Sequence, residues 1–78
     1  MVISSLVVET LPEFTQAAEI ALNAMEGVEV HEVNDYKLVV TIEAESTDES
    51  HAIASSFIQV EGVIGVNLIY FNFEDETL

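Results

Sequence analysis

The sequence contains no cysteine and no arginine, and it has one lysine, Lys37, against 15 aspartate and glutamate residues. Without cysteine the chain forms no disulfides, thiolate metal sites or thiol redox centres. Its formal net charge of −14 repels nucleic-acid phosphates, which proteins bind mainly through lysine and arginine. The same charge repels anionic membrane surfaces. We therefore expect no nucleic-acid partner and an attraction to cationic partners.

Long apolar runs are also missing, although half of the residues are hydrophobic. Every run is far shorter than the roughly 20 residues of a transmembrane helix, and the chain does not open with a basic segment followed by an apolar one. At 78 residues there is room for one domain, and this hydrophobic content excludes disorder of the whole chain. We expect a single domain over residues 1–78, located in the cytoplasm without membrane insertion, with a frayed acidic tail at 74–78.

Candidate catalytic groups are few. The two histidines, His31 and His51, lie on different predicted elements, and neither stands near a serine or aspartate in a nucleophile and base pattern. They do not have the spacing of a metal-ligand set. The three glycines are dispersed one by one, unlike those of a phosphate-binding loop. The sequence therefore predicts no enzyme activity, no cofactor and no metal.

A strand–helix–strand pattern occurs twice along the chain. The first copy predicts a strand at 2–8, a helix from the capping-box pair Thr10 and Glu13 to about Met25, and a strand at 28–33. The second predicts a strand at 37–44, a helix starting at the pair Ser46 and Glu49, and a strand at 63–73. Gly27 and Gly62 end the helices. This order predicts an α+β ferredoxin-like βαββαβ fold, with an antiparallel sheet in the order 4-1-3-2 and two helices on one face.

Period-two alternation divides each predicted strand between two faces of the sheet. One face is consistently apolar, and we assign it to the helix-covered core. Its strand residues are Leu6, Val8, Val28, Val30, Leu38, Val40, Ile42, Val66, Leu68 and Tyr70. The helix residues predicted to face it are Phe14, Ala17, Ala18, Ala21, Leu22, Met25, Ile53, Ala54, Phe57 and Ile58.

The opposite face of the sheet mixes apolar, hydroxyl and acidic groups. It is our candidate binding face, made of Ser5, Val7, Glu29, His31, Val39, Thr41, Glu43, Asn67, Ile69 and Phe71. A solvated face would be more polar, and a second buried face would not carry Glu29 and Glu43. An apolar patch rimmed by carboxylates suits a ligand that is part apolar and part cationic. Ordinary strand propensity is the alternative explanation, since valine, isoleucine and threonine favour strands wherever they point.

Four segments, in order and over most of the chain, resemble the NapD family. They are Ser5-Leu6-Val7-Val8, the helix end Glu26-Gly27-Val28-Glu29-Val30, and the runs at 37–45 and 60–70. Members of that family are cytoplasmic chaperones that bind the twin-arginine signal peptide of the periplasmic nitrate reductase catalytic subunit. They delay its export until the molybdenum cofactor and iron–sulfur cluster are inserted. The resemblance implies this function and this partner here. A histidine expected after Tyr70 is replaced by Phe71-Asn72, so no role of that histidine transfers.

Other interpretations of the sequence stay open. Regulatory modules of similar topology bind small ligands, usually as side-by-side dimers. Nothing in this chain resembles their ligand loop, and the net charge opposes self-association, so we expect a monomer. A salt-adapted domain of unrelated role would also be acidic. If a peptide binds, it lies either as a helix across the sheet or as a strand added to an edge.

Overall fold

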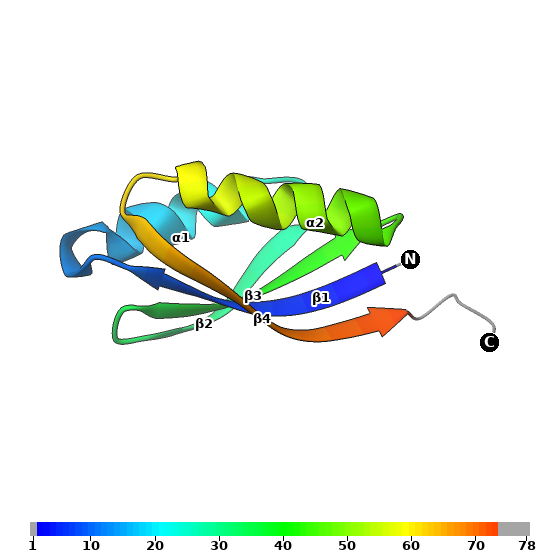
Figure 1. The fold of residues 1–78 in the computed structure, drawn as a ribbon. Helices are drawn as coiled ribbons and strands as arrows, with labels where there is room; N and C mark the ends of the chain where they lie inside the picture. Colours follow the sequence, from blue (N-terminus) through cyan, green and yellow to red (C-terminus); the bar gives the residue numbers. More distant parts are fainter. Residues whose placement is uncertain (1, 74–78) are drawn as a thin grey trace.

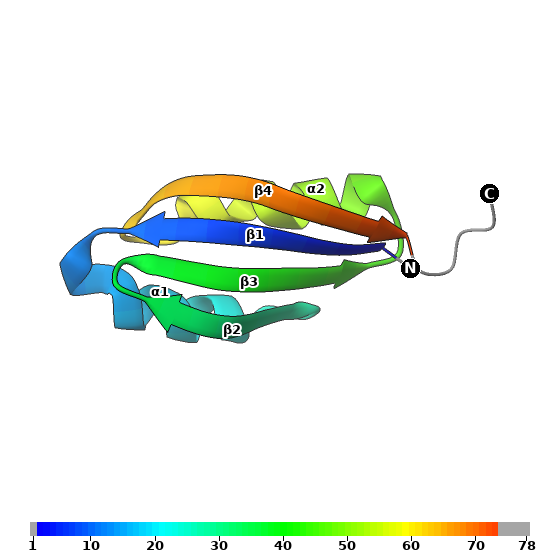
Figure 2. The same ribbon diagram turned by 90° about the horizontal axis from the view of Figure 1, so that it is seen from below.

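The computed structural model describes residues 2–73, with side chains for residues 2–69. Its elements are β1 (Val2–Thr10), the 3₁₀ helix η1 (Pro12–Phe14), α1 (Thr15–Asn23), β2 (Val28–Asn34), β3 (Lys37–Ala44), α2 (Thr47–Ser56), the 3₁₀ helix η2 (Phe57–Gln59) and β4 (Val63–Phe73). The strands form one antiparallel sheet in the order β2-β3-β1-β4. Both α-helices lie on one face of this sheet (Figure 1), and neither covers the other face (Figure 2). The predicted ferredoxin-like fold and strand order are confirmed. The predicted tail at 74–78 lies outside the described residues.

The core lies between the sheet and the two helices. Alternation along β1 and β3 turns every second side chain towards the helices, as predicted, and these side chains are almost fully buried. Among the side chains of residues 2–69, Phe57 from η2 is the largest that is fully buried. The buried apolar residues are Val2, Leu6, Val8, Ala18, Leu22, Val28, Leu38, Val40, Ile42, Ala44, Phe57 and Val63.

Helix α2 begins at the predicted position and is held to β1 by a buried hydrogen bond. The Ser46 hydroxyl accepts a hydrogen bond of 3.1 Å from the backbone N–H of Glu49, which satisfies one of the free donors at the helix start. The hydroxyls of Ser4 and Ser50 are 2.6 Å apart, and both residues are buried. Because each hydroxyl has the other as its partner, neither leaves an unsatisfied polar group in the core.

The predicted start of the first helix is wrong. Strand β1 continues to Thr10, whose side chain is buried, and its hydroxyl lies 2.7 Å from the hydroxyl of Thr15 instead of capping a helix. The chain then makes the η1 turn, with Pro12 at its first position, before α1 begins at Thr15. The α-helix ends at Asn23, two residues before the predicted end at Met25.

Gly27 and Gly62 follow the helices as predicted, and both have the positive φ angles, 79° and 91°, that favour glycine. At Gly27 the backbones also approach closely, because an added Cβ would lie 2.6 Å from the carbonyl oxygen of Glu43. Gly27 therefore fixes how the start of β2 meets the end of β3. No helix within residues 2–73 is both long enough and apolar enough to cross a bilayer.

Three residues predicted to be in the core are exposed. Ile58 is 55% exposed and Leu68 is 51% exposed, while Ala17 on α1 is also exposed. Leu68 belongs to the edge strand β4, which packs mainly against η2, whereas α2 packs mainly against β3 and β1. A groove between α2 and β4 leaves Leu68 accessible. The side chain of Tyr70 lies outside the described side chains.

Candidate functional site

Five of the predicted binding residues lie together at the middle of the uncovered sheet face. Val39, Val7 and Asn67 are directly opposite one another on β3, β1 and β4, and Thr41 is opposite Ser5 in the adjacent row. Side chains opposite each other on paired strands have Cβ atoms about 4.5–5.5 Å apart. Ser5, Val7, Val39 and Thr41 are half-buried by neighbours within the sheet, whereas Asn67 is exposed. No helix covers this face. We call the apolar pair Val7 and Val39 the centre of this open face.

A depression of about 420 Å³ lies at one end of the open face. Its lining includes Ile3, Glu29, His31 and Glu43, together with Thr41 from the group above. The Nε2 atom of His31 lies 2.7 Å from the Thr41 hydroxyl, and its Nδ1 atom lies 3.9 Å from a carboxylate oxygen of Glu29. The two glutamates are exposed, so an ion pair with either would contribute only about 0–1 kcal/mol.

The other end of the open face carries the only lysine of the chain. Lys37 begins β3 and Glu43 lies six residues further along the same face, which corresponds to about 20 Å in a strand. The Lys37 ammonium lies 3.8 Å from a carboxylate oxygen of Glu9, its register partner on β1. The open face therefore has Glu29 and Glu43 at one end and the Lys37–Glu9 pair at the other, while Glu32 lies opposite Val39 at the β2 edge between them. A ligand with its cationic groups at one end has a preferred direction on this surface.

Two bulges interrupt the strict alternation on which the predicted face assignments rest. His31 is the extra residue where the β2–β3 register shifts between Val30 and Glu32, and Ile69 is the extra residue between the β4 partners of Ser5 and Leu6. Ile69 is highly exposed at the β4 edge. Beyond this bulge the backbone of Phe71 pairs with Ser4. The Phe71 side chain lies outside the described side chains.

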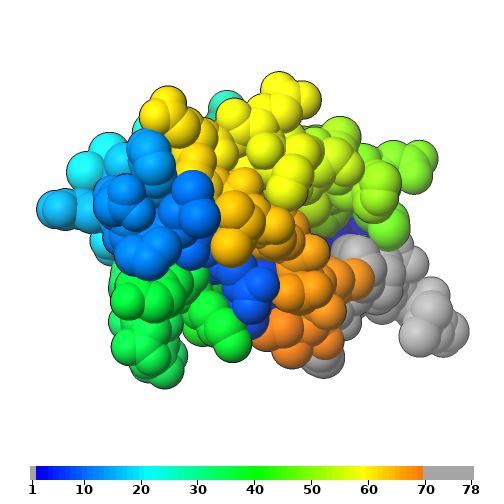
Figure 3. All heavy atoms as spheres, turned by 60° about the vertical axis from the view of Figure 1, so that its left-hand side comes forward, coloured from blue at the N-terminus to red at the C-terminus, as the bar shows by residue number. Residues whose placement is uncertain are grey.

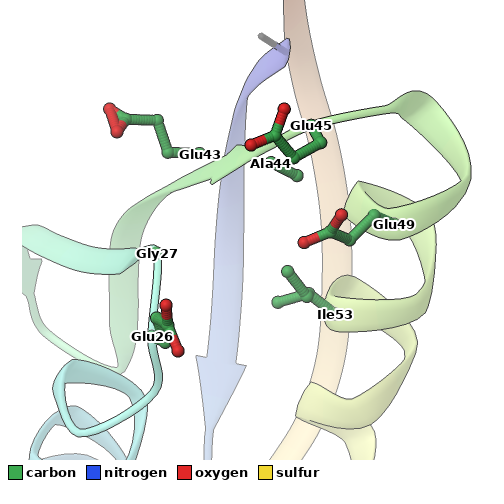
Figure 4. A pocket seen from close by; sticks show the side chains of 7 residues that line it. All are labelled: Glu26, Gly27, Glu43, Ala44, Glu45, Glu49 and Ile53. Carbon is green, nitrogen blue, oxygen red and sulfur yellow. The ribbon is translucent and has the colours of Figure 1, made fainter.

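A second acidic depression was not anticipated from the sequence. It has a volume of about 800 Å³ and is lined by Glu26, Gly27, Glu43, Ala44, Glu45, Glu49 and Ile53. Figure 4 shows Glu45 and Glu49 on the α2 side of it and Glu26 beside the α1–β2 connection, with the Glu43 carboxylate pointing away from the others. It adjoins the open-face depression, because Gly27 and Glu43 line both.

The pairing of β2 with β3 explains why this second depression is acidic. Glu26 and Glu45 each lie just beyond the paired ends of β2 and β3, so pairing these strands brings the two carboxylates to the same end of the sheet. Among residues 2–73, no three histidine, aspartate or glutamate side chains lie close enough together to hold a metal ion.

Comparisons with known proteins agree on one family. The family model described as NapD protein matches residues 1–75. The solution structure of the Escherichia coli Tat proofreading chaperone protein NapD superimposes with a TM-score of 0.82 at 32% sequence identity, and the match covers 97% of this chain and 82% of that one. A search of curated protein sequences finds no match.

Proposed function

Because this chain belongs to the NapD family, we propose that it binds the twin-arginine signal peptide of the periplasmic nitrate reductase catalytic subunit. In this proposal it acts as a monomer in the cytoplasm and delays export until cofactor insertion is complete. The family supports the chaperone role. The observation that favours the peptide is the open face, whose apolar centre has exposed carboxylates at one end and the single lysine at the other.

The two halves of such a peptide would meet different parts of this face. Adjacent arginines would lie at Glu29 and Glu43, where guanidinium groups can form bidentate hydrogen bonds with carboxylates. The apolar residues that follow would cover Val7 and Val39. The charged contacts remain exposed and contribute about 0–1 kcal/mol each, whereas apolar burial contributes about 25 cal/mol per Å². Apolar contact would therefore supply most of the affinity, and charge would supply direction and selectivity.

The proposed activity needs no chemical step. A peptide lying on the open face is not available to the export machinery, so occupancy alone delays export. The duration of the delay is then set by the dissociation rate, which is where most affinity differences between related complexes arise.

Isothermal titration calorimetry with a synthetic signal peptide tests this function. The parent peptide is compared with a control in which both arginines are replaced by glutamine, at low and at physiological salt. We expect the control to bind more weakly, and we expect the difference to shrink as salt rises, since exposed charges are screened over about 8–10 Å. Equal binding of both peptides at low salt would contradict the electrostatic selection, and no binding of either would contradict the function.

A further inference from the structure

Exposed apolar side chains gather along the edge strand β4. Ile64 and Ile69 are each 59% exposed, and Leu68 and the neighbouring Ile58 of η2 are more than half exposed. These four residues lie on two elements that pack against each other, and Figure 3 shows the orange atoms of β4 directly beneath the yellow atoms of α2 and η2. The opposite edge strand, β2, carries Glu29, His31 and Glu32 instead. Charged side chains of this kind protect a sheet edge, whereas β4 has none from Val63 to Ile69.

A groove of about 360 Å³ runs between α2 and β4 on the helix side of this edge. Its lining includes Ala54, Ile58, Val66, Leu68 and His51, and no carboxylate is among the described residues that line it. It differs in this respect from both acidic depressions, whose linings include glutamates. The groove is thus suited to an apolar segment, and arginines would be drawn to the acidic depressions instead.

The groove is continuous with the open face around the edge of the sheet. Leu68 lines the groove, and the next residue, Ile69, is the exposed residue at the β4 bulge and belongs to the predicted binding face. Since neighbouring strands are about 4.8 Å apart, the open face spans only about 14 Å from β2 to β4. The apolar stretch of an export signal has roughly 7–15 residues, which is about 10–22 Å as a helix and more when extended. A stretch at the upper end of this range extends past β4.

We infer that the groove between α2 and β4 binds the distal part of the signal peptide's apolar stretch, after the proximal part has crossed the open face. This inference rests on the proposed function. Charge complementarity selects this occupant, because an apolar segment tethered to arginines is drawn to a chain with a net charge of −14. A second copy of the same chain would be repelled by the same charge.

The test uses a short and a long signal peptide, each labelled for fluorescence anisotropy. The short peptide includes the arginine pair and the proximal part of the apolar stretch, and the long one includes the whole apolar stretch. The variant protein carries Ile58→Ser together with Leu68→Ser, and the matched control carries Ile20→Ser, which removes a 64% exposed side chain from α1. We expect the variant to bind the long peptide roughly tenfold more weakly and the short peptide within about twofold of the parent. The Ile20→Ser control should change neither affinity.

Retained affinity of the variant for the long peptide would overturn the inference while leaving the proposed function intact. Equal losses for both peptides would also overturn it, because the groove would then not distinguish the distal segment. The other possible occupant of the groove is a second copy of the chain, which sedimentation analysis detects. If the parent is a dimer, and the two substitutions convert it to a monomer without changing peptide affinity, the groove binds a second copy and the inference is wrong. If the parent binds neither peptide, the proposed function fails and this inference fails with it.

Discussion

Replacing Val7 with glutamate should block peptide binding without unfolding the protein. Val7 lies at the centre of the open face, opposite Val39 and Asn67, and its half-buried side chain points away from the helix-covered core. A longer side chain at this position can extend into solvent, so no core atom has to move. Val7→Glu therefore tests the proposed binding surface without changing the core on the other side of the sheet.

The expected loss of binding free energy follows from the groups around Val7. In the free protein the nearest like charge on the same strand face is Glu9, two residues away or about 7 Å, where repulsion in water is about 0.6 kcal/mol before screening. In the complex the new carboxylate would be covered by apolar peptide residues without a hydrogen-bond partner, which costs at least about 3 kcal/mol because a charged group costs more to bury than the about 1–3 kcal/mol of a neutral one. Attraction to the arginines recovers at most about 1 kcal/mol in an exposed pair. A net loss of about 2 kcal/mol corresponds to roughly 30-fold weaker binding.

Calorimetry of Val7→Glu beside Ile20→Glu measures this effect. Both variants replace an apolar side chain by glutamate and add the same charge, but Ile20 is an exposed residue of α1, which lies on the helix side of the sheet. Thermal unfolding followed by circular dichroism should show that both remain folded. If Val7→Glu folds and binds the signal peptide within about twofold of the parent, the open face is not the site.

Three further outcomes are expected. Phe57→Ala empties the largest fully buried position and should cost about 3–5 kcal/mol, lowering the thermal midpoint by at least about 12 °C, with a smaller shift arguing against the packing described. Ser46→Ala removes the cap that accepts from the Glu49 N–H and should cost about 1 kcal/mol in denaturant unfolding, whereas an equal cost for the exposed neighbour in Thr47→Ala would argue against capping. Glu29→Gln and Glu43→Gln should each weaken peptide binding by about 1 kcal/mol at low salt, and an unchanged affinity in calorimetry would place the arginines elsewhere.

The fold was predictable because local signals agree with one another along the chain. Alternation in β1 and β3 identifies Leu6, Val8, Leu38 and Val40 as core residues, and the two glycines mark both helix ends. The Ser46 cap was also correct. The helix start predicted at Thr10 was wrong because the capping-box spacing is a local pattern. In the structure, β1 pairs with β4 as far as Thr10 and Val63, so Thr10 belongs to the strand.

The candidate site was less predictable because it depends on register. A bulge inserts one residue without a marked change in sequence, so the extra positions of His31 and Ile69 are not visible from alternation. Exposure of Leu68 depends on how far α2 reaches over the sheet, and no property of Leu68 itself reports this. The second acidic depression required the pairing of β2 with β3 to bring Glu26 and Glu45 to one end.

Methyl NMR of the complex tests the central proposal most directly. With valine and isoleucine methyl groups labelled, nuclear Overhauser contacts from the signal peptide are recorded to the protein. The proposal predicts contacts to Val7 and Val39 on the open face and none to Ile20 on α1, while the buried Val8 and Val40 make none. Contacts to Ile20 without any to Val7 or Val39 would contradict binding on the open face.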